Sequence, residues 1–161
     1  MEIGRISISI SQRFDVRSGA GMTRGHWEHF SHPSDIGIRG VAPTKEEAFA
    51  QAAVAMTAVI ADPEKVEPKE AVDIICRDDD DEMLFVGWIS SLLYEMATRN
   101  MLFSRFDVQF TDDGLEARAW GEPVDIDKHE PAVEVKAATY AGLQVGRDND
   151  GNWVAQCIVD V

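Results

Sequence analysis

Two stretches of the chain carry hydrophobic residues at helical spacing. Thr44 and Glu47 have the T-x-x-E form of a capping box, which predicts a helix over residues 45–61, ended by an Asp-Pro pair. A second helix is predicted over residues 82–98. The faces expected to be buried consist of Ala48, Phe49, Ala52, Ala53, Met56, Val59 and Ile60 in the first helix, and of Leu84, Phe85, Trp88, Ile89, Leu92 and Met96 in the second.

Other stretches have the character of strands. HWEHFSH predicts a short strand or an extended segment, DIGIRGVA a strand, and AVDIICR (71–77) a strand covered on both faces. After the second helix, strands are predicted in LFSRFDVQF, LEARAWGE, AVEVKAATYAGLQV and WVAQCIVDV, whereas PVDIDKHEP predicts a loop or a short turn of helix. RDNDGN predicts a hairpin turn with Asp150-Gly151 as its tight element.

This order of elements favours one fold class. Strands and helices do not alternate regularly, as they would in a doubly wound parallel sheet, and the chain finishes with a run of strands. We therefore expect an α+β sandwich, in which mostly antiparallel sheets pack with two main helices. The length of 161 residues fits one domain, which we place at residues 22–161. Residues 1–21 are interpreted as an extension outside it, although ISISIS could also be an ordered edge strand.

Composition and charge narrow the classes of function. Hydrophobic residues make up 45% of the chain, which is enough for a core, and the net charge of −14 disfavours tight binding of a phosphate polymer. Cations, or a protein with a basic face, are the expected partners. No stretch is long enough to span a membrane and no signal peptide is recognised. Cys76 and Cys157 lie in apolar runs and are expected to be buried and reduced, as in a cytoplasmic protein.

The three closely spaced histidines suggest a zinc cage at first sight. His26, His29 and His32 would have to converge on one ion, but residues 26 and 29 of an extended chain point to opposite faces. We expect surface histidines on an edge strand instead, with Trp27 and Phe30 packed below them.

Isolated charges near strand ends are the stronger candidates for a site. Asp35 precedes an apolar strand, and Asp160 is the only charged residue in WVAQCIVDV. Either could be a solvated or capping residue, but two such carboxylates brought together would need a cation or a lysine between them. Lys136 is predicted to point out of the core, where it could neutralise the acidic site or contact a partner. The alternative interpretation is an ordinary surface lysine without a function. The run Asp78–Asp81 is interpreted as charge at a helix N-terminus.

Four motifs, in order, resemble those of the archease family. HPSDIGIRG followed by TKEEAFAQAA resembles its N-terminal His-x-x-Asp strand and helix; GEPVDIDKHEP resembles its Gly-Glu loop ending in His; VEVKAATYAGLQV resembles its Lys-Ala-x-Thr-Tyr strand; WVAQCIVDV resembles its C-terminal strand. The resemblance covers about residues 26–161 and implies an Hsp33-like sandwich. Pro33 departs from the small residues commoner after the motif histidine.

The resemblance also implies a function. Archeases activate the RtcB-type RNA ligase by promoting guanylylation of its active-site histidine and by allowing multiple turnover in tRNA splicing and RNA repair. Residue by residue, it implies that Asp35, Asp160 and the terminal carboxylate of Val161 bind a divalent cation, calcium first, with magnesium or manganese as alternatives. Lys136 and the motif histidine His32 are expected to act in activating the partner.

Two other functions remain open on the sequence. One is a metal-dependent hydrolase that uses Asp35 and Asp160, for which His32 is the nearby candidate base. The other is a chaperone-like protein-binding module, suggested by fold analogy. We favour a monomeric, cytoplasmic activator that is not itself an enzyme, contacts an RtcB-type ligase and does not bind RNA tightly.

Deleting residues 1–21 is expected to leave the domain folded and active, because the motifs that carry the resemblance all follow them. Thermal unfolding of the full and shortened chains measures this. The melting temperatures should agree within about 3 °C, which is about 1 kcal/mol for a domain of this size. A larger fall would show that ISISIS is a structural strand.

Overall fold

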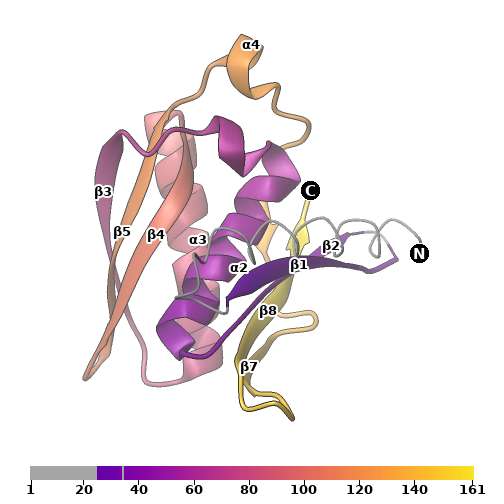
Figure 1. Cartoon of the computed structure of the whole chain (residues 1–161), viewed down its shortest axis with the longest axis vertical. Coiled ribbons are helices and arrows are strands. Elements are labelled where there is room, and N and C mark those ends of the chain that lie inside the picture. The colour runs from indigo at the N-terminus through magenta and orange to yellow at the C-terminus, as the bar shows by residue number, and fades with distance from the viewer. Residues whose placement is uncertain (1–24, 34) are drawn as a thin grey trace.

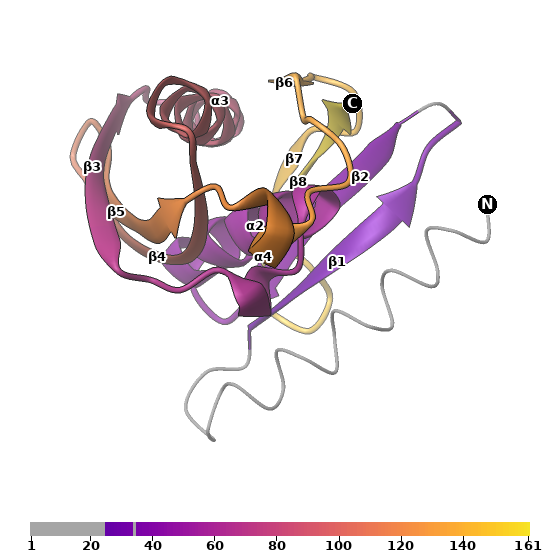
Figure 2. The same ribbon diagram turned by 90° about the horizontal axis from the view of Figure 1, so that it is seen from above.

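The computed structural model describes residues 25–33 and 35–161, and in this part of the chain two antiparallel sheets face each other across a helix (Figures 1 and 2). The first sheet has the order β1-β2-β8-β6, and β7 also pairs with β8; the second has the order β3-β5-β4. All pairings are antiparallel, which confirms the α+β prediction. The strands are β1 (His26–Ser31), β2 (Ile36–Ala42), β3 (Glu70–Arg77), β4 (Met101–Thr111), β5 (Gly114–Pro123), β6 (Ala137–Ala138), β7 (Gln144–Arg147) and β8 (Trp153–Asp160).

The helix between the sheets is α2 (Lys45–Ile60), and it contacts β2 and β8 on one side and β4 on the other (Figure 2). Its N-cap is Thr44, whose hydroxyl accepts a 3.1 Å hydrogen bond from the Glu47 N–H, as the capping-box pattern predicts. A helix covered on two sides cannot have a hydrophilic face over most of its length. Accordingly, its alanines are buried almost all the way round, and they keep the sheets close.

The closest approach of α2 to a sheet is at Gly40 in β2. A Cβ atom at this position would lie 2.1 Å from the main-chain oxygen of Ala48 and 2.5 Å from the main-chain nitrogen of Ala52. Neither backbone atom can move without shifting the helix. Glycine at residue 40 therefore sets the spacing between α2 and the first sheet.

Helix α3 (Asp81–Arg99) covers the inner side of β3 and reaches both sheets. All six residues predicted for its buried face are buried. Asp80 caps the helix by accepting from the Glu82 N–H, and this confirms the interpretation of the acidic run as helix N-terminal charge. The shorter helices are η1 (Pro63–Lys65) and α4 (Ile126–His129), the latter in the segment predicted as a loop or a turn of helix.

Two strand predictions differ from the structure. Residues 71–77 do not form a strand covered on both faces, because α3 covers the side of Val72 and Ile74 whereas Asp73 and Ile75 are exposed. The strand predicted in AVEVKAATYAGLQV is divided into β6 and β7 by a turn in which Gly142 has a φ of 63°. Both pieces pair with β8, so the turn forms a bulge beside that strand.

Both cysteines are free and buried, as expected from their apolar surroundings. Burial raises the pKa of the Cys157 thiol to about 12. Among the described residues, no helix is long and apolar enough to cross a membrane. The prediction that residues 1–21 are a separate extension, with or without a strand in ISISIS, lies outside the described residues.

Replacing Gly40 by alanine is expected to destabilise the protein by about 3 kcal/mol, because the added methyl group would overlap backbone atoms of α2. Urea unfolding measures the loss. Gly146→Ala in β7 is the matched control, since a Cβ there would meet no atom within 4 Å. Equal stabilities of the two variants would contradict the role given to Gly40.

Candidate functional site

The end of β8 lies beside the start of β2. In the ladder between these strands Ile36 pairs with Val159, and continuing this register by one residue places Asp35 opposite Asp160. Residues opposite each other in such a ladder have Cβ atoms about 5 Å apart, which is within the reach of two carboxylates that share one cation. Asp35 and Asp160, which are far apart in the sequence, thus lie at the adjacent ends of β2 and β8.

On its other side, β8 pairs with β6. Ala137 is the partner of Asp160 in this ladder. The preceding N–H, that of Lys136, donates a 2.7 Å hydrogen bond to the main-chain oxygen of Asp160. The end of β8 therefore lies between the segment of Asp35 and that of Lys136, and all of the sequence-predicted residues except His32 belong to this group.

Burial changes abruptly at this end of β8. Val159 is completely buried, whereas Asp160 is exposed, Val161 is 36% exposed and Asp35 is half-buried. Lys136 is exposed, as predicted. His32 is also exposed and lies in the connection between β1 and β2. Asp160 and Lys136 thus reach the surface directly after buried residues, Val159 and Val135, whereas Asp35 directly precedes β2.

The residues fit a hard divalent cation. Oxygen donors from two aspartates suit calcium or magnesium rather than zinc. Among the described residues, no hydrogen bond or ion pair involves the carboxylates of Asp35 and Asp160 or the ammonium group of Lys136. Within residues 25–33 and 35–161, no three His, Cys, Asp or Glu side chains gather as a metal cage. A cation here would therefore need the Val161 carboxylate and water to complete its shell.

The histidines of β1 point to opposite faces of that strand, as the extended pattern predicts. His29 was expected at the surface, and this was wrong: it is 7% exposed, and its Nε2–H donates a 2.8 Å hydrogen bond to the Ala55 oxygen on α2. Burial lowers the pKa of His29. His26 lies on the other face, where its Nε2 is 2.7 Å from Glu28. Phe30 is also on that face, half-buried over Gly37, rather than packed below.

Sequence analysis did not identify a cluster under α4, although both of its central residues belong to the motif GEPVDIDKHEP. His129 is 2% exposed; its Nδ1 accepts a 2.9 Å hydrogen bond from the Asp125 N–H, so its Nε2–H donates to Glu122 over 2.8 Å. The same Glu122 oxygen also accepts from the Lys128 ammonium at 2.8 Å and from the Glu67 N–H at 3.0 Å. A buried carboxylate with this many donors is stabilised in its charged form.

This cluster anchors the segment that leads from β5 to the end of β8, residues 124–136, which we term the crossing segment. The Ala132 N–H donates to the Ile60 oxygen, and Val135 is buried in the core. The final bond is the one from Lys136 to Asp160. The position of Lys136 is therefore set by a series of contacts that begins at the cluster under α4.

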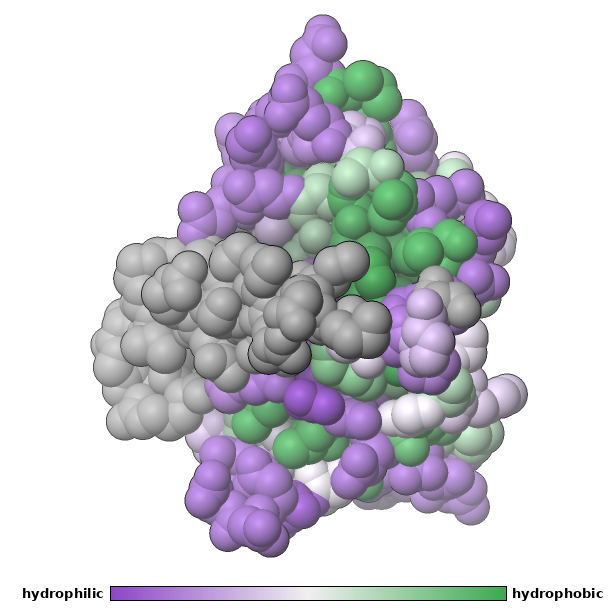
Figure 3. Space-filling view, turned by 90° about the vertical axis from the view of Figure 1, so that its right-hand side faces the viewer, coloured by the Kyte–Doolittle hydropathy of each residue, from purple (hydrophilic) through white to green (hydrophobic). Residues whose placement is uncertain are grey.

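Hydrophobic side chains gather on the side of the molecule that carries β1, β2 and the C-terminus, in the upper part of that face (Figure 3). Along the crossing segment and at the end of β8, Ile126, Val133 and Val161 are 67%, 43% and 36% exposed. Exposed aliphatic residues of this kind, next to charged ones, are typical of surfaces that contact proteins.

Comparison with known families, sequences and solved structures finds the same group of proteins each time. The sequence profile of the archease protein family matches residues 27–161. Protein archease of Pyrococcus furiosus is 41% identical over 139 residues, covering 84% of this chain and 98% of its own, and that of Sulfurisphaera tokodaii is 41% identical over 138 residues with the same coverage. The solution structure of Methanobacterium thermoautotrophicum protein 1598 has 34% identity and a TM-score of 0.72 over 84% of this chain and 98% of its own. The crystal structure of an archease from Thermotoga maritima, at 16% identity, agrees in fold with a TM-score of 0.55 over 82% and 94%.

The cluster under α4 is expected to make stability depend on acid. Desolvation raises the pKa of Glu122, but the hydrogen bonds from Lys128, from the Glu67 N–H and from His129 outweigh it and lower the pKa from 4.5 to about 2. A carboxylate whose folded-state pKa is lowered stabilises the fold above its unfolded pKa, and this contribution is lost as the pH falls from about 4.5 towards 2.

Urea unfolding at a series of pH values tests this expectation. Glu122→Gln should cost about 3 kcal/mol at neutral pH and should flatten the acid dependence. Glu130→Gln is the control, because that side chain is exposed and about 3.7 Å from its lysine partner. An acid dependence of Glu122→Gln as steep as that of the wild type would disprove the role of this carboxylate.

Proposed function

The chain belongs to the archease protein family, and we propose that it activates an RtcB-type RNA ligase by protein contact. In this proposal it promotes guanylylation of the ligase's active-site histidine and allows multiple turnover in tRNA splicing or RNA repair. It is a protein cofactor of the ligase and not itself an enzyme. Its buried thiols fit the reducing conditions of the cytoplasm.

The observation that carries the proposal is the position of Asp160. Asp35 lies about a hundred residues before Lys136 and Asp160 in the sequence, yet these residues of three archease-like motifs lie at the adjoining ends of β2, β6 and β8. A pattern that merely served folding would not require these charged groups at the exposed end of a buried strand. This arrangement supports the proposal that the group meets a partner outside the chain.

We propose that Asp35, Asp160 and the Val161 carboxylate hold a divalent cation, calcium first, with magnesium or manganese as alternatives. The ion would supply positive charge that fixes both side chains in one orientation. Asp160 would be the most strongly oriented ligand, because its main chain pairs with Ala137 and accepts the hydrogen bond from the Lys136 N–H. With so few protein ligands, the affinity should be modest.

Lys136 and His32 are proposed to act on the ligase directly. Lys136 is exposed and in no ion pair among the described residues, so its ammonium group is available to a phosphate or carboxylate of the partner. Its backbone is fixed by the hydrogen bond to Asp160, so only the side chain has to be ordered on binding. The exposed Ile126 and Val133 would add apolar contact next to these charges.

Asp35→Ala and Asp160→Ala are expected to lower stimulation of the ligase at least tenfold, about 1.4 kcal/mol, while the fold is retained. The measurement is guanylylation of an RtcB-type ligase from the same organism, with GTP and Mn²⁺, in the presence and absence of this protein. Asp150→Asn is the matched control, because it removes an exposed carboxylate in the β7–β8 turn. Full stimulation by Asp35→Ala would remove the acidic pair from the mechanism.

Lys136→Ala distinguishes the proposed binding of a cation from the proposed contact with the ligase. It should weaken stimulation but leave calcium binding, measured by titration calorimetry, unchanged. Absence of stimulation by the wild-type protein would refute the proposed function and would favour a metal-dependent hydrolase instead.

A further inference from the structure

Strand β3 is an edge strand. Within the described residues it pairs with β5 and with no other strand, and it lies at the left margin of Figure 1. The Asp78 N–H, just beyond the strand, donates a 3.0 Å hydrogen bond to the Asp113 oxygen beside the end of β5. Because hydrogen-bonded positions alternate in an antiparallel ladder, the even-numbered residues of β3 bond to β5. The main-chain groups of Ala71, Asp73, Ile75 and Arg77 therefore face outward, and we term this row the β3 edge.

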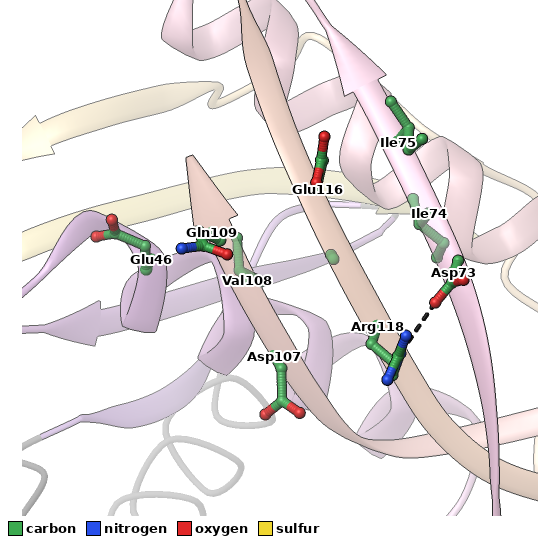
Figure 4. A pocket seen from close by; sticks show the side chains of 10 residues that line it. Glu46, Asp73, Ile74, Ile75, Asp107, Val108, Gln109, Glu116 and Arg118 are labelled. Atoms are coloured by element: carbon green, nitrogen blue, oxygen red, sulfur yellow. Dashed lines mark hydrogen bonds and ion pairs between the residues drawn. The ribbon is translucent and has the colours of Figure 1, made fainter. Parts of the chain in front are cut away.

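The side chains of the β3 edge share the outer face of the sheet. Asp73, Ile75 and Arg77 are all exposed, and Ile75 is 58% exposed in the middle of them. Figure 4 shows Asp73 and Ile75 beside a hollow of about 640 Å³ on this face. Charged residues commonly protect an edge strand from pairing, but an isoleucine between two opposite charges leaves its centre available.

The order Asp73, Ile75, Arg77 is self-complementary. If a second copy approaches the β3 edge antiparallel, with a two-fold axis through Ile75, each Ile75 lies opposite the other and each Asp73 lies opposite an Arg77. All of these are odd-numbered residues, so their outward N–H and C=O groups meet as hydrogen-bonded pairs. A slip by one residue would bring outward-facing groups opposite groups already bonded to β5.

We propose that β3 is a dimerisation edge whose partner is a second copy of this chain. The two second sheets then form one continuous sheet, in which Ile75 packs on Ile75 and two Asp73–Arg77 pairs flank it. A two-fold contact of this kind is closed, because each copy uses its β3 edge once. Dimerisation would replace the sequence-based expectation of a monomer, for which the chain provided no specific observation.

The intramolecular ion pairs of these residues do not prevent the contact. Asp73 accepts from Arg118 at 2.9 Å, and Arg77 donates to Asp113 at 2.8 Å. All four side chains are more than half exposed, so each pair has little stability to lose. In the dimer Asp73 would lie between Arg118 of its own chain and Arg77 of the second copy.

Charge reversal tests this geometry. Sedimentation equilibrium of the full chain should show a monomer–dimer equilibrium. The protein concentration is raised to about 1 mM, because association that needs a higher concentration is not specific. Asp73→Arg and Arg77→Asp should each weaken the dimer at least about tenfold, since two attractions become two repulsions. The double variant should restore dimerisation to within about threefold of the wild type, because the pattern is again self-complementary. Ile75→Lys should abolish the dimer.

Two control variants remove the intramolecular pairs only. Arg118→Ala and Asp113→Ala should dimerise like the wild type, and their melting temperatures show the effect of losing each pair on the fold. A monomeric wild type up to about 1 mM, assemblies larger than a dimer, or a dimer insensitive to both single charge reversals would each overturn the proposal. None of these outcomes bears on ligase stimulation, because Asp160 lies in the other sheet and Asp35 directly precedes a strand of it.

Discussion

Helix α2 has a sheet on each side, and both sheets need its side chains to be small. Alanine is the most frequent residue on this helix, and the larger Phe49 and Met56 are completely buried. Gly40 allows β2 to approach the helix backbone. Thr57, in the last turn of α2, donates from its hydroxyl to the Phe103 oxygen of the second sheet, which satisfies a buried polar group between them. Because the two sheets contact each other mainly through α2, their relative positions follow from the residues along this one helix.

The candidate site depends indirectly on the spacing that α2 sets between the two sheets. The acidic end of β8 belongs to the first sheet, but Lys136 reaches it through the crossing segment, which starts from the second sheet at β5. The buried pair of His129 and Glu122 fixes the start of this segment, and the bond from Ala132 to Ile60 attaches its middle to the end of α2. A change in the spacing between the sheets would therefore move the lysine relative to the aspartates.

The sequence alone predicted the features that local patterns specify. Both main helices, the capping box at Thr44 and the alternation of His26 and His29 follow from spacing, since side chains repeat with a fixed period in each element. The pairing of Asp35 with Asp160 was expected from family resemblance, because no local rule relates residues so far apart. The burial of His29 and the exposure of the outer face of β3 were missed, since they depend on which element covers each strand face. The cluster of Glu122 and His129 was missed for the same reason: Glu67 and Lys128 reach it from separate segments.

The ladder between β2 and β8 also has a consequence for how the chain folds. β3, α3, β4 and β5 follow one another directly, so the second sheet and its helix form from contacts that are close in the sequence. The pairing of β2 with β8 instead closes a loop that contains nearly the whole domain, and closure of so long a loop is entropically costly and slow. We expect the first sheet to be completed last, so that a partly folded chain has its second sheet and α3 but not the acidic end of β8. The surface proposed to meet the ligase would then exist only in molecules that have finished folding.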